Sequence, residues 1–329
     1  MSSFRIRSTS TVALPAGAAS GEPLPLSAFD SLWVTHPPLL NVFLFPSTTP
    51  ATPFPVLVDS LKRSLSQTLP LFHPFAGELT YLPSSQSVAI VCRDDGPGAT
   101  FIEAETDVDF QGLIDADELD DEVLRQLVPD IWWDALPAAP LLAAQATEFV
   151  GGGGVAVGLA CHHAVVDGHG LIQFMKTWAA VAERSGPDPP SPLHDRRLVR
   201  FDGDEEFTRS TLCRMAPNLP SAVREVKANP LKHMSDKDIA GFAIDSERTL
   251  LIPGSPWFPM YEFDLGFGRP ARVERAGLDG PEQAYLTAGM SPGSVQAMMV
   301  ISAGKIQAFR EAFKLDAVDG DGPVRSESE

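Results

Sequence analysis

The chain has 329 residues, enough to bury a sizeable core and to form one large or two ordinary domains. Hydrophobic residues make up 44% of it, and 43 acidic against 25 basic residues give a net charge of −18. That charge argues against binding to nucleic acid or to an anionic membrane. The three cysteines, Cys92, Cys161 and Cys213, are scattered and odd in number, which is typical of a reducing compartment. Because no signal-like or membrane-spanning apolar run is present, we expect a cytoplasmic protein.

The first half of the chain alternates predicted strands with an amphipathic helix. The helix is predicted over 54–69, where Val58, Leu61 and Leu65 recur on one face and Pro70 ends the pattern. Short apolar runs bounded by turn residues predict strands over 40–45, 87–92, 99–104 and 140–150. This pattern predicts an α/β (α+β) protein with mixed sheets and flanking helices.

Several features in this half are assigned to packing or to solvent. Phe29 and Trp33 fall at helical spacing and are expected in the core rather than in contact with a ligand. His73 lies near a turn and is interpreted as structural. The acidic stretch 103–121 is interpreted as a solvated loop and helix face rather than a cation site. The glycines of 151–154 lack the Gly-Lys-Ser/Thr of a phosphate loop and predict a hairpin turn.

The segment richest in chemistry follows a predicted buried strand over 155–160. His163 and Asp167 come where this strand ends, a common location for functional residues in α/β proteins. Gly168 then breaks the strand, and a helical pattern begins at Leu171. An imidazole in such a place can take a proton from a hydroxyl or amine nucleophile, an effect worth roughly 10²–10⁴-fold in rate.

The segment also allows other interpretations. Alternation along a strand places Cys161 and His163 on one face and His162 on the other. The two histidines could simply be core residues satisfied by backbone groups. A zinc site is disfavoured because no second cluster of ligands has suitable spacing. An acyl-cysteine route through Cys161 is discounted, since cysteine on such strands is most often a small buried hydrophobe.

Two motifs carry a resemblance to a known family. His163-x-x-x-Asp167-Gly168 resembles the signature of the BAHD family of plant acyl-CoA-dependent acyltransferases. The residues of 264–268, Asp-Leu-Gly-Phe-Gly, are similar to its Asp-Phe-Gly-Trp-Gly hallmark, with Leu265 and Phe267 replacing Phe and Trp. Together with the Leu-Pro-Leu-Ser-Ala-Phe-Asp-Ser-Leu-Trp run at 24–33, they most resemble the branch of phenolic and flavonoid glucoside malonyltransferases.

The resemblance implies a chloramphenicol-acetyltransferase-like two-domain fold whose second domain is incomplete. The expected parts are an N-terminal acyltransferase domain over 1–192, a crossover remnant over 193–220, a partial C-terminal domain over 221–315 and an acidic tail over 316–329. The doubled histidine also resembles peptide-synthetase condensation domains, an alternative weakened by the Asp-Leu-Gly-Phe-Gly segment.

The resemblance also implies roles for individual residues. His163 would deprotonate an acceptor hydroxyl that attacks the thioester directly, while Asp167 turns away and orders its loop. Structural roles are expected for the remaining motif residues, Gly168, Asp264, Gly266 and Gly268. The co-substrate would be malonyl-CoA or an aromatic acyl-CoA and the acceptor a phenolic or flavonoid glycoside. No bound cofactor or metal is expected, the CoA-binding residues stay unassigned, and the protein would act as a monomer.

One departure from the family raises a rival hypothesis. The residues at 163 and 264 lie 101 positions apart, about half the family spacing, so a block is inferred to be absent near 218–222. With it goes an Asn-x-Arg segment whose arginine is expected to pair with the motif aspartate, and a buried Asp264 without that arginine would be costly. The alternative is therefore a truncated, catalytically impaired paralogue or a mis-spliced product that acts at most as a binding partner.

Overall fold

The computed structural model describes residues 3–183 apart from short gaps, and residues 191–196, 252–278, 283–302 and 304–318. The block inferred to be absent near 218–222, the acidic tail beyond 318 and Cys213 all lie outside the described residues. Within the described part, no helix is both long and apolar enough to cross a membrane.

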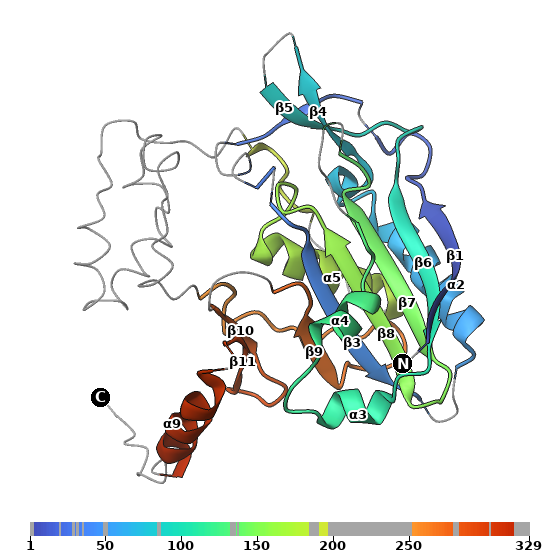
Figure 1. The fold of residues 1–329 in the computed structure, drawn as a ribbon. Coiled ribbons are helices and arrows are strands. Elements are labelled where there is room, and N and C mark those ends of the chain that lie inside the picture. The colour runs from blue at the N-terminus through green and yellow to red at the C-terminus, as the bar shows by residue number, and fades with distance from the viewer. Residues whose placement is uncertain are drawn as a thin grey trace, which may run out of the picture.

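A six-stranded sheet forms the centre of the molecule (Figure 1). Its order is β1 (Phe4–Val12), β6 (Ala99–Thr106), β7 (Leu142–Phe149), β8 (Gly154–Cys161), β3 (Leu39–Pro46) and β9 (Arg272–Arg275). All neighbours are antiparallel except the pair β6–β7. The last strand comes from the region after the second motif, so the C-terminal half of the chain completes a sheet that the N-terminal half begins.

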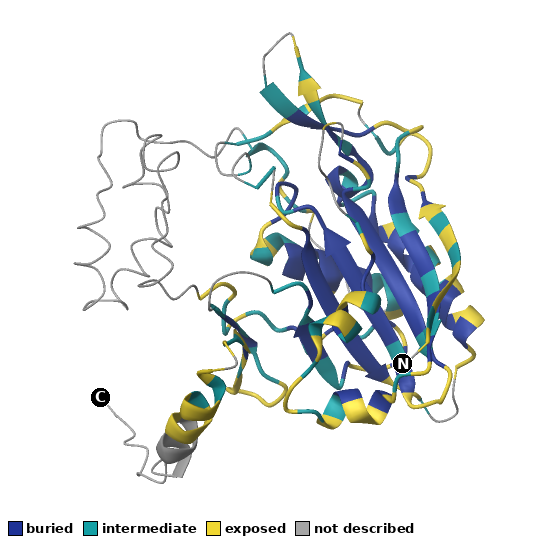
Figure 2. Ribbon diagram, viewed as in Figure 1, coloured by how far each residue is buried: buried dark blue, intermediate teal, exposed yellow. Residues whose placement is uncertain are grey.

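Helices cover both faces of this sheet, which explains why most residues of its central strands are apolar and buried (Figures 1 and 2). On β3, Phe43 and Phe45 join the core beneath α2 (Phe54–Thr68) and α5 (Gly168–Glu183), whereas Val42 and Leu44 face α3 (Phe110–Asp115) and α4 (Asp121–Gln126). This division follows from the two-residue period of a strand.

Two close contacts fix these layers. The Trp178 indole N–H on α5 donates to Ser64 Oγ on α2 at 2.9 Å, and both side chains are buried. On the other face, a side chain at Gly158 of β8 would lie 2.0 Å from the Leu127 carbonyl oxygen. Glycine is therefore required there, because the backbone that follows α4 approaches the sheet directly.

Smaller elements flank the main sheet. A three-stranded sheet has the order β2 (Leu24–Pro25), β5 (Ser87–Val91) and β4 (Glu78–Leu82). A short 3-10 helix, η1 (His73–Ala76), directly precedes β4. A separate hairpin of β10 (Gln283–Ala288) and β11 (Val295–Val300) precedes α9 (Ile306–Val318). Figure 2 shows that the outer parts of these elements are the more exposed ones.

The elements predicted from the pattern are confirmed. The strands expected over 40–45, 87–92, 99–104, 140–150 and 155–160 correspond to β3, β5, β6, β7 and β8, and the helix over 54–69 to α2. One boundary was wrong: α5 begins at Gly168 rather than at Leu171. The reason is local, since the Asp167 carboxylate accepts a hydrogen bond from Gly170 N–H and so starts the helix earlier.

Candidate active site

A tight turn over 162–165 carries the imidazole of the first motif. Strand β8 ends at Cys161, and the next residue donates its backbone N–H to the Leu141 carbonyl at 3.0 Å. Val165 N–H closes the turn on the His162 carbonyl at 3.0 Å, and Ala164 N–H donates to His162 Nδ1 at 3.2 Å. His162 is fully buried and serves the turn from inside, whereas His163 projects from it. His162 and His163 face different ways, as expected, but they do so because they lie in a turn and not because they alternate along a strand.

His163 is half-buried and lies flat against an aromatic ring. Its imidazole stacks on Trp33 with ring centroids 3.9 Å apart and an interplanar angle of 10°. Its Nδ1 is buried and has no hydrogen-bond partner among the described residues. Burial lowers the pKa of His163, with smaller lowering effects from Arg275 and His36, while its own backbone and Asp167 act in the opposite direction. The ring is therefore neutral at neutral pH, the form that can accept a proton.

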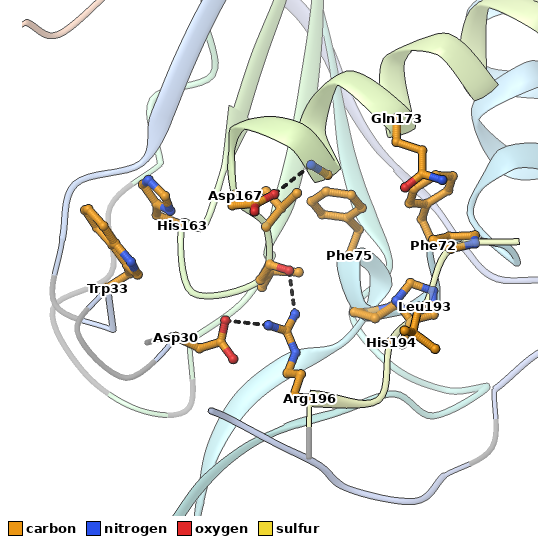
Figure 3. Close-up of a pocket in the computed structure, with 15 residues that line it drawn as sticks. Asp30, Trp33, Phe72, Phe75, His163, Asp167, Gln173, Leu193, His194 and Arg196 are labelled. Carbon is orange, nitrogen blue, oxygen red and sulfur yellow. Dashed lines mark hydrogen bonds and ion pairs between the residues drawn. The ribbon is translucent and has the colours of Figure 1, made fainter. Parts of the chain in front are cut away.

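Asp167 is exposed and turned away from this imidazole. Its Oδ1 accepts a hydrogen bond from Gly170 N–H at 2.7 Å, and its carbonyl accepts from Leu171 N–H at 2.9 Å, in the manner of a helix N-cap (Figure 3). A side chain at Gly168 would lie 2.6 Å from the Phe258 ring, so the first residue of α5 has to be glycine. Asp167 therefore caps α5, and Gly168 lies where a side chain would meet Phe258.

The imidazole opens onto a cavity of about 490 Å³ (Figure 3). Most of its lining is apolar and includes the aromatic side chains of Trp33, Phe72 and Phe75, and α5 contributes Gln173. Trp33 packs against the core, and its ring also lines the cavity, which its spacing in the sequence did not indicate. Phe29, which was paired with it, lies outside the described residues.

The segment 191–196 supplies another wall, and sequence reasoning missed its role. His194 lines the cavity, and its Nε2 lies 2.8 Å from the Leu71 carbonyl oxygen. Arg196 reaches across to Asp30 and to the Val165 carbonyl. The only available signal was the resemblance of the His-Asp-Arg run to the segment with which family members leave their first domain. His73 does not line the cavity, and its ring packs against His194 at 4.7 Å.

The second motif lies far from His163. Gly266 sits beside the Ala182 carbonyl at the end of α5, whereas the imidazole lies at the start of that helix. At 1.5 Å per residue, the two ends are roughly 20 Å apart. Asp264 Oδ1 accepts backbone N–H bonds from Gly266 at 2.8 Å, Phe267 at 3.1 Å and Gly268 at 2.9 Å.

These contacts answer the concern over the absent arginine. The Asp264 carboxylate is only half-buried, and three backbone N–H groups compensate its charge. Gly266 and Gly268 have φ of +93° and +101°, which side chains other than glycine rarely adopt. The Phe267 ring packs on Phe45 at 4.7 Å and anchors the loop to the sheet.

Two alternative chemistries find no support in this geometry. Cys161 is fully buried, its Sγ lies 3.9 Å from the Leu39 carbonyl oxygen, and burial raises the pKa of its thiol to about 12. It does not line the cavity and is therefore not placed to form an acyl-enzyme. Within the described ranges, no group of three or more His, Cys, Asp or Glu side chains is arranged to hold a metal ion.

Comparisons with known proteins agree with this picture. The model of the Transferase family matches residues 5–239. Phenolic glucoside malonyltransferase 1 of Bemisia tabaci is 36% identical over 191 residues, covering 58% of this chain and 40% of that protein. Coumaroyl-CoA:anthocyanidin 3-O-glucoside-6''-O-coumaroyltransferase 1 of Arabidopsis thaliana is 31% identical over 214 residues, covering 61% and 45%. The chain thus spans less than half the length of these curated relatives.

Solved structures show the fold. The crystal structure of vinorine synthase aligns with a TM-score of 0.65 at 17% identity, covering 90% of this chain and 94% of that one. F. sporotrichioides TRI101 complexed with coenzyme A and T-2 aligns with a TM-score of 0.55 at 12% identity, covering 88% and 97%. The predicted α/β fold of the chloramphenicol-acetyltransferase type is therefore confirmed.

Proposed function

Since this chain belongs to the Transferase family of BAHD acyl-CoA-dependent acyltransferases, we propose that it moves an acyl group from CoA to a hydroxyl of a phenolic or flavonoid glycoside. The observation that carries the proposal is the half-buried His163 on the wall of a cavity of about 490 Å³. A neutral imidazole at such a place can act on a small-molecule hydroxyl while surrounding rings exclude water.

In the proposed reaction His163 is the general base. It takes the proton of the acceptor hydroxyl as the oxygen attacks the thioester carbonyl, forming the new C–O bond. The C–S bond then breaks, and the imidazolium returns the proton to the departing CoA thiolate. Asp167 also lines the cavity, but its Oδ1 is held on Gly170 N–H, so it orders the loop and takes no proton in this reaction. The glycine-rich loop around Asp264 stabilises the fold at the other end of α5.

The lining of the cavity favours an aromatic acyl group over malonyl. Trp33, Phe72 and Phe75 offer flat apolar surfaces for a ring. Two described lining residues could offer a positive charge, Arg196 and His194. The Arg196 guanidinium is already paired with Asp30. Burial lowers the pKa of His194, which keeps that ring neutral. A malonyl carboxylate would therefore enter without a counter-charge, which is costly in a partly desolvated site.

A purified sample can test this directly. Release of free thiol is followed from malonyl-CoA and from an aromatic acyl-CoA with a flavonoid glucoside as acceptor. His163→Ala should lower kcat roughly 10²–10⁴-fold. His169→Ala is the matched control, since His169 is exposed on the first turn of α5 and does not line the cavity. Equal rates for wild type and His163→Ala would remove the general-base assignment.

The partial coverage of the curated relatives supports a second candidate function. Because the chain covers only 40% and 45% of the two curated relatives, it could be a catalytically impaired paralogue that still binds acyl-CoA or the glycoside. Calorimetric binding of these compounds without thiol release would identify that case. Three further expectations stay predictions: the cytoplasmic location, the monomeric state, and the domain division near residues 192 and 221. Size-exclusion chromatography tests the monomeric state.

A further inference from the structure

Two turns from distant parts of the chain meet at the mouth of the cavity. One is the turn over 162–165 that carries His163. The other begins at Asp30, whose carbonyl accepts a hydrogen bond from Trp33 N–H at 3.0 Å. Their projecting side chains stack, with the Trp33 and His163 centroids 3.9 Å apart. No backbone-to-backbone hydrogen bond joins the two turns within the described residues, although the His162 side chain hydrogen-bonds to the backbone of Val34, so side chains set their separation.

Arg196 bridges the two turns (Figure 3). Its Nη1 donates to Asp30 Oδ1 at 2.5 Å, and its Nη2 donates to the Val165 carbonyl at 2.6 Å. The second oxygen of Asp30 accepts from the backbone N–H and the hydroxyl of Ser27, at 2.8 Å and 2.6 Å. Ser27 therefore holds one oxygen of the Asp30 carboxylate, and the Arg196 guanidinium holds the other.

The environment makes this bridge strong. The Arg196 and Asp30 side chains are only 16% and 17% exposed, so water screens the ion pair weakly. Arg196 Nε is buried and has no partner among the described residues, which leaves both terminal nitrogens as the contacts that orient the group. A planar fork can hold two acceptors at once, whereas a lysine ammonium is a single point charge.

We propose that Arg196 is a positioning residue for the proposed acyl transfer, tying the turn of Asp30 to the turn of His163 and so holding Trp33 stacked on the imidazole at the cavity mouth. The proposal rests on the proposed function for its kinetic consequence but not for its geometry. It also gives the segment 191–196 a role in catalysis, because Arg196 both lines the cavity and orients the base.

The test compares three variants with a matched control. Arg196→Ala removes the bridge, Arg196→Lys keeps the charge but serves one acceptor, and Asp30→Asn removes the ion pair. Arg272→Lys is the control, because Arg272 is 17% exposed and donates to the Leu113, Ile114 and Ala116 carbonyls. It pairs with Leu44, at the end of β3 opposite to the imidazole.

The first readout is the His163 ring itself, measured by NMR on histidine-labelled protein and assigned as the signal missing from His163→Ala. In wild type the Trp33 ring should shift this signal strongly, and the signal should titrate below the ordinary range because burial lowers the pKa of His163. Arg196→Ala should remove most of the ring-current shift and return the titration toward 6.5. Arg196→Lys and Asp30→Asn should lie between, and Arg272→Lys should match wild type.

The second readout is the split between kcat and KM. A misplaced base should lower kcat by about 100-fold in Arg196→Ala, while KM for the acyl-CoA changes little. If Arg196→Ala does not fold, Arg196→Lys and Asp30→Asn carry the test. Unchanged ring-current shifts in the Arg196 variants, or an equal loss in Arg272→Lys, would overturn the proposal. Absence of turnover in wild type would instead refute the proposed function, and the NMR comparison would still decide the bridge.

Discussion

Removing the Asp264 carboxylate should destabilise the protein without disturbing the base. One oxygen, Oδ1, accepts three backbone N–H bonds, from Gly266, Phe267 and Gly268. A hydrogen bond to a charged group contributes about 1.5–3 kcal/mol when buried. The two glycines are exposed, so water would replace the carboxylate at their N–H groups, whereas the Phe267 N–H is less accessible. We therefore expect Asp264→Ala to lower the free energy of unfolding by about 2–3 kcal/mol, well below the sum of three full bonds.

Urea denaturation with an unchanged m value measures this loss. Asp264→Asn keeps an acceptor oxygen and should lose about half as much free energy. Asp109→Ala is a useful control, since Asp109 caps α3 through a single bond to Gln111 N–H and should cost about 1 kcal/mol. Below the unfolding transition, kcat of Asp264→Ala should equal that of wild type. Loss of kcat with an unchanged free energy of unfolding would show that Asp264 takes part in the reaction and that the separation of the two motifs has been misjudged.

The remaining predictions concern the base, a buried thiol and one helix contact. Because burial lowers the pKa of His163 and the base must be neutral, kcat/KM should stay constant as pH falls to 6.5 and decline only below it; a decline that begins above 6.5 contradicts this. Cys161→Ala should keep most of the acyl transfer. In the wild type the Cys161 thiol should resist alkylation at pH 7, since burial raises its pKa to about 12. Abolished turnover in that variant would revive an acyl-cysteine route. Ser64→Ala should cost about 1–3 kcal/mol in urea denaturation, because it leaves the buried Trp178 N–H without a partner. An unchanged transition midpoint would mean that the indole finds another acceptor.

Local patterns of residue type predicted the elements of this protein well. The strands β3 and β8 are almost entirely apolar, with Asn41 of β3 as an exception, because helices cover them on both sides. The helix α2 shows the helical period because it has one covered face. The two motifs also stood out in the sequence, since His163, Asp167 and Gly168 occupy fixed places after a buried strand, and the second motif is rich in glycine. These features depend on a few neighbouring residues, which a linear pattern records.

Contacts between distant segments could not be obtained in this way. Nothing in the spacing shows that Trp33, besides packing against the core, stacks on His163. Arg196 meets Asp30 across 166 residues, and the pairing depends on how the segment after α5 returns over the turn. The sequence by itself therefore determined the strands, the helices and the identity of the candidate base. Only the tertiary structure decided which side chains surround that base and that Asp264 lies at the far end of α5. The reason is that packing brings distant segments together, and the separation of two residues along the chain does not give their distance in space.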